Sequence, residues 1–173
     1  MKLKAIFSVL TLSILVFACG GDDDNDDPFA SVPSSEIVDI ELRDAALSGS
    51  ASSSGRSAAV GQKWWLQKVS KIDLSGECGD AESQEVTTEY YYAFYPSGQY
   101  YYQSSKEGTP ISAGSWQWVD SNTKDAIYVN VQAGQVEFTL RGLNDDELII
   151  ASDQSQASCT VITWEQFGNP YEE

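Results

Sequence analysis

The segment that decides the fold is AIYVNVQAGQVEFTLR, residues 126–141. Apolar side chains occupy every second position before and after Ala133-Gly134, a period of two that is typical of strands with one buried face. The two residues between the runs leave room only for a tight turn, so the two strands are antiparallel neighbours. The segment predicts a hairpin with one face in a core and the other face in water.

Further candidate strands continue this pattern toward both ends of the chain. Short segments rich in residues that tolerate turn dihedrals separate them, at 96–98, 120–123, 142–146 and 153–156. Connections this short join antiparallel neighbours, because a parallel crossover needs a dozen or more residues. The eight strands that we expect are residues 64–74, 86–95, 99–104, 114–119, 126–132, 135–141, 147–152 and 159–167.

A meander of this size predicts an all-β fold. Strands with one wet face close most economically as an eight-stranded antiparallel up-and-down barrel, because closure leaves no exposed edge strand. A two-sheet sandwich is the alternative. It normally needs long crossovers, and only residues 75–85 and 105–113 are long enough to supply them.

Composition excludes several classes of function. The chain has 173 residues, a formal net charge of −16 and no histidine. Negative charge of this size repels phosphate backbones, so we expect no nucleic-acid partner. Ser-His-Asp and Cys-His catalysis and His-ligated zinc all need an imidazole, and the spacing of the acidic residues selects no catalytic pair. We therefore expect a protein that is not an enzyme and that has no metal or other cofactor.

The N-terminus is a targeting segment. Lys2 and Lys4 precede a mainly apolar run, residues 5–18, that is shorter than the ~20 residues needed to span a bilayer. The junction Val16-Phe17-Ala18-Cys19 resembles the lipobox of bacterial lipoproteins. That resemblance implies a signal peptide at residues 1–18 and an acylated Cys19 that anchors the mature protein to a membrane. An ordinary signal peptide followed by a chance cysteine is the alternative.

The residues after Cys19 predict a tether, residues 19–60, that is first acidic and then rich in serine. The acidic run at 20–27 resembles the stretch that follows the lipidated cysteine in surface-exported lipoproteins of the Bacteroidetes group. The resemblance implies an outer-membrane protein that faces the cell exterior. A solvated spacer and a weak calcium site are the alternatives. Within the tether, residues 36–47 fit a short helix and a strand equally well.

Four further motifs occur in order along the expected barrel. They are Trp64-x-Leu66 in the first strand, Phe94 to Gly98 in a hairpin, Gly114-Ser115-Trp116, and the late strand Leu148-Ile149-Ile150. Together with the lipoprotein start, this order resembles the lipocalin-like domain of bacterial surface lipoproteins. The resemblance assigns residues 61–173 to a small β-barrel with a binding or scaffolding role, and it carries over no enzymatic residues.

Two cysteines remain once Cys19 is acylated, an even number in an exported protein. Cys78 lies just beyond the first expected strand and Cys159 begins the last. Because these strands are neighbours in a closed meander, we expect a disulfide between Cys78 and Cys159 at the closure. Two unpaired buried thiols are the alternative.

Aromatic side chains crowd two successive expected strands, and consecutive tyrosines must point to both faces of the sheet. We expect Tyr90, Tyr92 and Phe94 to point inward and Tyr91 and Tyr95 to point outward. Cross-strand packing explains such crowding without any function. The alternative is an exposed aromatic platform for recognition.

Two kinds of binding are compatible with these residues. An interaction module with a filled barrel would use the outward rings of Tyr91, Tyr95 and Tyr101 to meet a glycan or a protein, for instance as an inhibitor of a host or rival enzyme. Eight strands are just wide enough for large side chains to fill the barrel, which favours this interpretation. A small-molecule carrier would instead have an internal apolar cavity. The residues expected to line that cavity are Trp64, Leu66, Tyr92 and Phe138.

Overall fold

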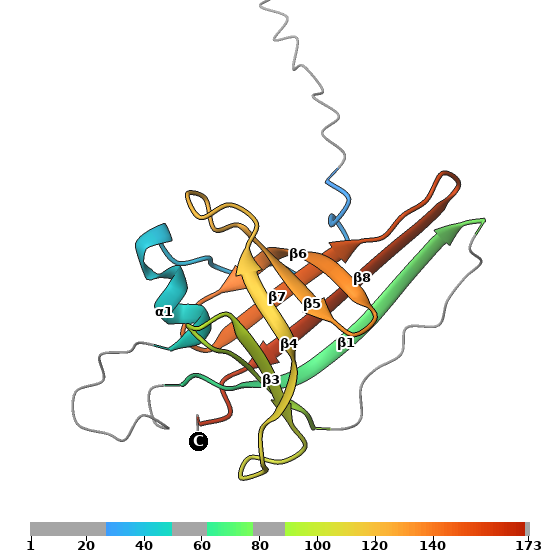
Figure 1. Ribbon diagram of the computed structural model, residues 1–173. Helices are drawn as coiled ribbons and strands as arrows, with labels where there is room; N and C mark the ends of the chain where they lie inside the picture. Colours follow the sequence, from blue (N-terminus) through green and yellow to red (C-terminus); the bar gives the residue numbers. More distant parts are fainter. Residues whose placement is uncertain (1–26, 50–61, 78–88, 172–173) are drawn as a thin grey trace, which may run out of the picture.

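The computed structural model describes residues 27–49, 62–77 and 89–171, and they form a closed antiparallel barrel (Figure 1). Each strand pairs with the next along the chain, and the last pairs with the first. The predicted eight-stranded up-and-down barrel is confirmed, and the sandwich alternative is wrong. The strands are β1 Trp65–Gly76, β2 Tyr91–Phe94, β3 Gln99–Gln103, β4 Ile111–Trp118, β5 Ala126–Val131, β6 Gly134–Leu143, β7 Glu147–Asp153 and β8 Cys159–Gly168.

Residues 126–141 form the predicted hairpin of β5 and β6. Their register runs from Ala126↔Thr139 to Val131↔Gly134, without a bulge. Ile127 and Val129 point into the core and are buried, whereas Tyr128 lies opposite Glu137 on the outer face. The period of two in the sequence therefore corresponds directly to the inner and outer faces of the barrel wall.

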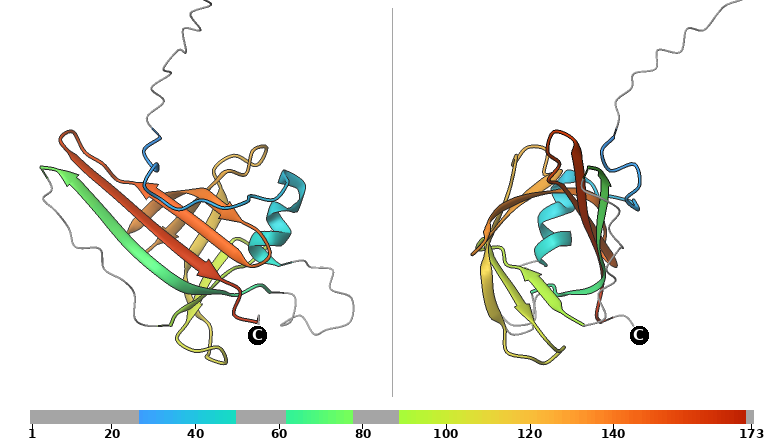
Figure 2. Two further views of the ribbon diagram at one scale, coloured as in Figure 1. Left: turned by 180° about the vertical axis from the view of Figure 1, so that it is seen from behind. Right: turned by 90° about the vertical axis from the view of Figure 1, so that its right-hand side faces the viewer.

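A short helical segment covers one end of the barrel. Helix η1 (Ile40–Leu42) leads into α1 (Arg43–Ser48), and a view along the barrel shows α1 at the far end, within the ring of strands (Figure 2, right). Leu47 is 0% exposed, and its carbonyl oxygen accepts a hydrogen bond from Trp65 Nε1 at 2.9 Å. α1 thus acts as a plug for this end.

The central part of the expected tether is in fact part of the folded domain. Residues 27–49 pack against the barrel, while residues 19–26 and 50–60 lie outside the described residues. The two interpretations of residues 36–47 both hold in part, because Ile37 forms a parallel bridge with Leu143 before the chain turns into η1 and α1. An alternating stretch and a helical stretch follow one another too closely for periodicity to separate them.

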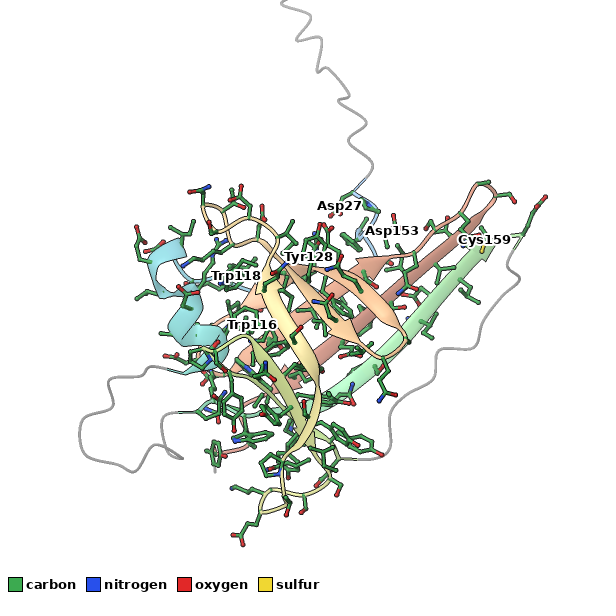
Figure 3. All side chains as sticks on the ribbon, viewed as in Figure 1. Asp27, Trp116, Trp118, Tyr128, Asp153 and Cys159 are labelled. Carbon is green, nitrogen blue, oxygen red and sulfur yellow. The ribbon has the colours of Figure 1, made fainter. Side chains whose placement is uncertain are left out.

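The pairing of β1 with β8 closes the barrel. It covers ten residue pairs, from Leu66↔Gly168 to Gly76↔Cys159. The two strands run on together beyond the rest of the barrel, and Cys159 lies near the far tip of this ribbon (Figure 3). Cys78 lies outside the described residues, so its disulfide with Cys159 stays a prediction.

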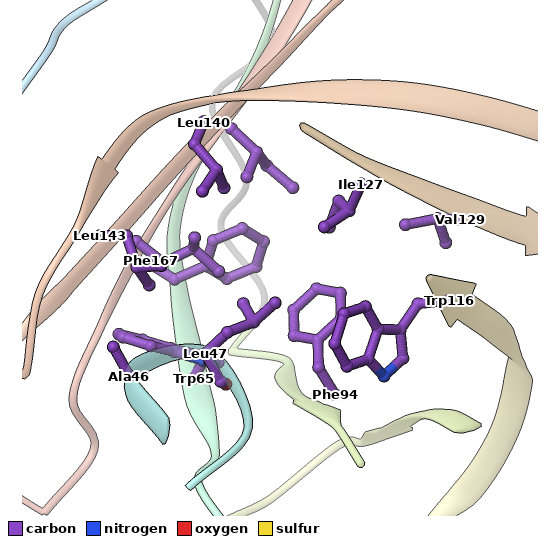
Figure 4. Packing of buried hydrophobic residues seen from close by; sticks show 12 residues of the cluster. Ala46, Leu47, Trp65, Phe94, Trp116, Ile127, Val129, Leu140, Leu143 and Phe167 are labelled. Carbon is purple, nitrogen blue, oxygen red and sulfur yellow. The ribbon is translucent and has the colours of Figure 1, made fainter. Parts of the chain in front are cut away.

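The main core fills the barrel at the α1 end (Figure 4). Aromatic and aliphatic side chains from both the helix and the strands meet there, and most of them have almost no accessible surface. Burial of this apolar area, at roughly 25 cal/mol per Å², is the main stabilising contribution to the fold. The buried members are Ala46, Leu47, Trp65, Phe94, Trp116, Ile127, Val129, Leu140, Leu143, Leu148, Ile150 and Phe167.

The outer face of β7 and β8 is also buried. Phe29 and Val32, from the segment that precedes η1, pack on Ile149, Ile162 and Trp164. A salt bridge of 3.0 Å between Arg141 and Asp27, on the same segment, accompanies this contact. Both faces of these two strands therefore contribute buried apolar side chains, unlike those of β5 and β6.

The plug role of α1 can be tested with two leucines from the same helical segment. Leu47→Ala removes a fully buried side chain and leaves a cavity, so we expect a loss of about 2–5 kcal/mol in the free energy of unfolding. Leu42 is 55% exposed, and Leu42→Ala should change stability by less than about 0.5 kcal/mol. Urea denaturation of both variants measures the difference. Equal effects would show that the helix does not contribute to the core.

Candidate functional site

The two ends of the barrel interior differ in accessibility. At the α1 end the inward side chains are almost completely buried. Farther along the barrel, inward-facing residues of β2, β3 and β8 are only half-buried, and both helices that the structure describes lie at the opposite end. The interior is therefore accessible from the end remote from α1. The half-buried residues are Tyr92, Tyr100, Tyr102, Thr163 and Glu165.

Glu165 is the most unusual of these inward residues. Alternation along β8 places Thr163, Glu165 and Phe167 inside the barrel, while Ile162 and Trp164 point outward. Among the inward-facing strand residues that the structure describes, Glu165 is the one with a carboxylate. Protein atoms surround it closely, yet part of its surface stays accessible.

The surroundings of Glu165 disfavour its charge. Burial raises the pKa of Glu165 to about 7, and a hydrogen bond with the side chain of Gln67 acts in the opposite direction. Gln67 projects inward from β1 and is 8% exposed. A carboxyl with this pKa is ionised only in part near neutral pH, so a small change in its surroundings changes its charge.

Tyr92 and Tyr100 lie beside Glu165, and together with the adjacent rings of Tyr90 and Tyr102 they form what we call the tyrosine wall. The rings of Tyr92 and Tyr100 stack at 5.8 Å with an interplanar angle of 10°, and Tyr90 contacts Tyr102 edge-on at 6.3 Å. Burial, followed by the charge of Glu165, raises the pKa of Tyr92 to about 12, and it raises the pKa of Tyr100 well above the ordinary value. Both phenols therefore stay protonated and can donate hydrogen bonds.

We call Glu165, Gln67 and the tyrosine wall the Glu165 site. It combines an aromatic lining with a few polar groups that converge from β1, β2, β3 and β8. Ligand-binding pockets typically have this composition, because apolar surface supplies affinity and a few polar groups supply orientation. No group of three or more Cys, Asp or Glu side chains that could hold a metal ion occurs in the described part of the chain.

A second hollow lies beside α1, outside the main core. It is an open groove of about 800 Å³ between α1, the β2–β3 turn and β4, and Trp116 and Trp118 border it (Figure 3). Trp118 Nε1 donates to Asp44 Oδ1 at 2.7 Å, and Trp116 Nε1 donates to the carbonyl oxygen of Tyr95 at 2.8 Å. The polar atoms of both indoles are thus satisfied within the protein. Trp116 is only 8% exposed, so the half-buried ring of Trp118 offers most of the indole surface in this groove.

The expected directions of the tyrosines are confirmed, but the expected platform is only partly exposed. Tyr92 packs against the main core, while Tyr91, Tyr95 and Tyr101 lie together in a separate outer cluster. Tyr91 is only 7% exposed, and the rings of Tyr95 and Tyr101 are 4.7 Å apart. Cross-strand packing therefore accounts for most of this outer surface.

Of the four residues expected to line an internal cavity, two point inward and two point outward. Tyr92 and Phe138 pack on the inner core, as expected. Trp64 and Leu66 belong instead to the outer cluster, and Trp65 occupies the inward position between them. The adjacent tryptophans make both phases of this strand apolar, so the sequence pattern does not distinguish inside from outside.

Glu165, Gln67 and Tyr100 were not singled out from the sequence. On β8, Ile162 and Trp164 lie on one face of the strand, and Val161, Thr163, Glu165 and Phe167 lie on the other. A strand that is buried on both faces gives no sign of which phase is inside. Phe167 is the available signal, because a buried aromatic in phase with Glu165 would place the carboxylate in the interior.

Comparison with known proteins does not assign a family. No model of a known protein family matches the chain, and no curated protein is significantly similar to it. None of the described helices is long and apolar enough to cross a membrane. Cys19 and most of the acidic run lie outside the described residues.

The charge of Glu165 should make stability depend on pH. The pKa of Glu165 is raised from the ordinary 4.5 to about 7, so between these two pH values the native protein keeps a proton that the unfolded chain loses. Stability should therefore fall as pH rises from about 4.5 to about 7 and stay low above that range. Glu165→Gln removes this effect, so the variant should gain roughly 2–3 kcal/mol over the wild type between pH 5 and pH 8.

Urea denaturation at pH 5 and pH 8 measures this gain. Glu137→Gln is the matched control, because the same chemical change then occurs on the exposed outer face of β6. The gain in stability from pH 5 to pH 8 should be larger in Glu165→Gln than in this control. A constant difference between Glu165→Gln and the wild type would contradict the assignment of a buried, ionisable carboxyl.

Proposed function

We propose that this protein is a non-catalytic, lipid-anchored binding protein of the outer membrane, whose barrel takes up a small ligand at the Glu165 site. The accessible inward residues next to a filled core carry the ligand part of the proposal. The lipobox-like junction at Cys19 and the acidic run after it support the location. The resemblance to lipocalin-like surface lipoproteins is compatible with both parts.

The packing of residues 27–49 limits how far the barrel would stand from the membrane. Only residues 19–26 separate the expected lipid from the segment that covers β7 and β8. A chain of this length spans at most about 30 Å. We therefore propose a barrel held close to the outer face of the membrane. The Cys78–Cys159 disulfide belongs to the same proposal, since a bond at the closure would be formed after export.

Uptake inside the barrel is favoured over recognition by the outer tyrosines. Of the three rings that the platform hypothesis needs at the surface, Tyr91 is 7% exposed, and Tyr95 and Tyr101 are half-buried against each other with their ring centroids 4.7 Å apart. The inward tyrosines, by contrast, lie beside Glu165 and Gln67, polar groups that can orient a ligand. This contrast is the observation on which the choice between the two sites depends.

A glycan or protein partner, including an enzyme that would be inhibited, is the second candidate. The apolar groove beside α1 favours it, because two tryptophans border a hollow of about 800 Å³. Trp and Tyr commonly anchor protein interfaces. This candidate uses a different end of the barrel, so binding at one site does not exclude binding at the other.

The membrane anchor can be tested at Cys19. Cys19→Ser removes the atom that would be acylated, so the variant should leave the membrane fraction because acyl chains supply the apolar anchor. Fractionation of cells that express the wild type or the variant measures this change. Ser31→Ala, a serine change within the same N-terminal region, should leave the fractionation unaltered. A variant that still sediments with membranes would refute the lipoprotein assignment.

Ligand uptake can be tested with the neutral apolar dye Nile red and the chain from Gly20 to Glu173. We expect saturable binding with increased fluorescence. Thr163→Phe places a large ring in the accessible interior and should weaken binding at least about tenfold, which is about 1.4 kcal/mol. Gln135→Phe adds the same ring on the exposed outer face of β6 and should have little effect. Equal affinity in both variants would place the dye elsewhere.

A further inference from the structure

The carboxylate of Glu165 faces polar and aromatic groups but no described cation. Gln67 and Ser70 approach it from β1, Ile150 lies opposite it on β7, and Tyr92 and Tyr100 approach from β2 and β3. The titratable groups among these neighbours are the two phenols, and both are neutral near pH 7. An ionised Glu165 therefore has no positive charge beside it within the described barrel.

The described lysines and arginines are engaged elsewhere. Lys71 forms a salt bridge of 2.9 Å with Asp73 on the outer face of β1, and Lys68 is exposed. Lys63 Nζ lies 4.0 Å from the centroid of the Trp65 ring and donates to the carbonyl oxygen of Asn144, at the α1 end. The remaining cations contact groups outside the Glu165 site: Arg43 with Thr123, Lys106 with Tyr171, Lys124 with Asp44, and Arg141 with Asp27.

An enclosed carboxylate without a cation is costly, and a ligand that brings a cation removes much of this cost. An anionic ligand would add repulsion at the same place. A neutral ligand would leave the ionised carboxylate as poorly paired as before. The charge of the site therefore selects for a positively charged group.

The tyrosine wall adds a second reason for a cation. The faces of aromatic rings carry negative electrostatic potential and attract an ammonium group within about 6 Å of the ring centroid. The same rings offer apolar surface against which a hydrocarbon or aromatic body can pack. Two tyrosines beside a single carboxylate, with two further rings next to them, thus match both halves of an amphiphilic amine.

We infer that the ligand of the Glu165 site is a protonated amine on an apolar or aromatic body, with its ammonium group paired with the Glu165 carboxylate and its body against the tyrosine wall. This inference rests on the proposed function, since it names the class of ligand that the barrel takes up.

Isothermal titration of the chain from Gly20 to Glu173 at pH 8 tests the inference with two matched probes. Phenethylamine and 2-phenylethanol have nearly the same shape and differ in charge. We expect the amine to bind at least tenfold more tightly than the alcohol. Glu165→Gln should remove this preference, whereas Glu137→Gln, on the exposed face of β6, should retain it.

A second measurement needs no variant at the site. Ammonium binding requires the ionised carboxylate, so amine affinity of the wild type should fall as pH decreases from 8 to 6, while affinity for the alcohol stays constant. An amine that binds no better than the alcohol at pH 8, or whose preference survives in Glu165→Gln, overturns the inference. If Nile red still binds in that case, the proposed uptake of a ligand remains. Failure of Nile red, amine and alcohol alike overturns both.

Discussion

β1 and β8 pair over ten residues, and this contact between the first and last strands turns a meander into a tube. Closure decides which face of each strand is inside, because the pairing of each strand with its neighbour fixes which side chains point toward the interior. It also sets the order of side chains along the interior. Trp65 and Phe167 come together next to α1, and Gln67 and Glu165 meet one step farther in. The core and the Glu165 site are thus successive parts of the same seam.

The interior is divided between stability and recognition. At one end, Leu47 of α1 completes a core with almost no accessible surface. Toward the other end, a carboxyl with a pKa of about 7 lies beside tyrosines that keep accessible surface. Such a group reduces stability at neutral pH, and perturbed groups in concave sites are frequently functional. The well-filled core at the plugged end stabilises the fold enough to offset the cost of a carboxyl that has no cation beside it.

Apolar surface on the outside of the barrel also has a structural explanation. Trp64 and Tyr91 are buried in an outer cluster, and Phe29 covers Trp164 on β8. Several strands are therefore apolar on both faces. This arrangement is uncommon for an antiparallel sheet, in which one face is usually wet. It also covers part of the expected aromatic platform, since Tyr91 is 7% exposed.

The sequence by itself determined the strands, their antiparallel order and the closed barrel, because alternation and short turns are local signals. The hairpin at 126–141 is the clearest case, with one phase apolar and the other polar. Only the tertiary structure decided the phase of β1 and β8, where Trp64 next to Trp65, and Trp164 next to Glu165, make both faces compatible with burial. The position of α1 as a plug could not be predicted from local sequence either, because a helix of six residues is stable only through the core that it contacts. Periodicity shows that a strand has two faces, but which face is inside depends on partners that are distant in the sequence.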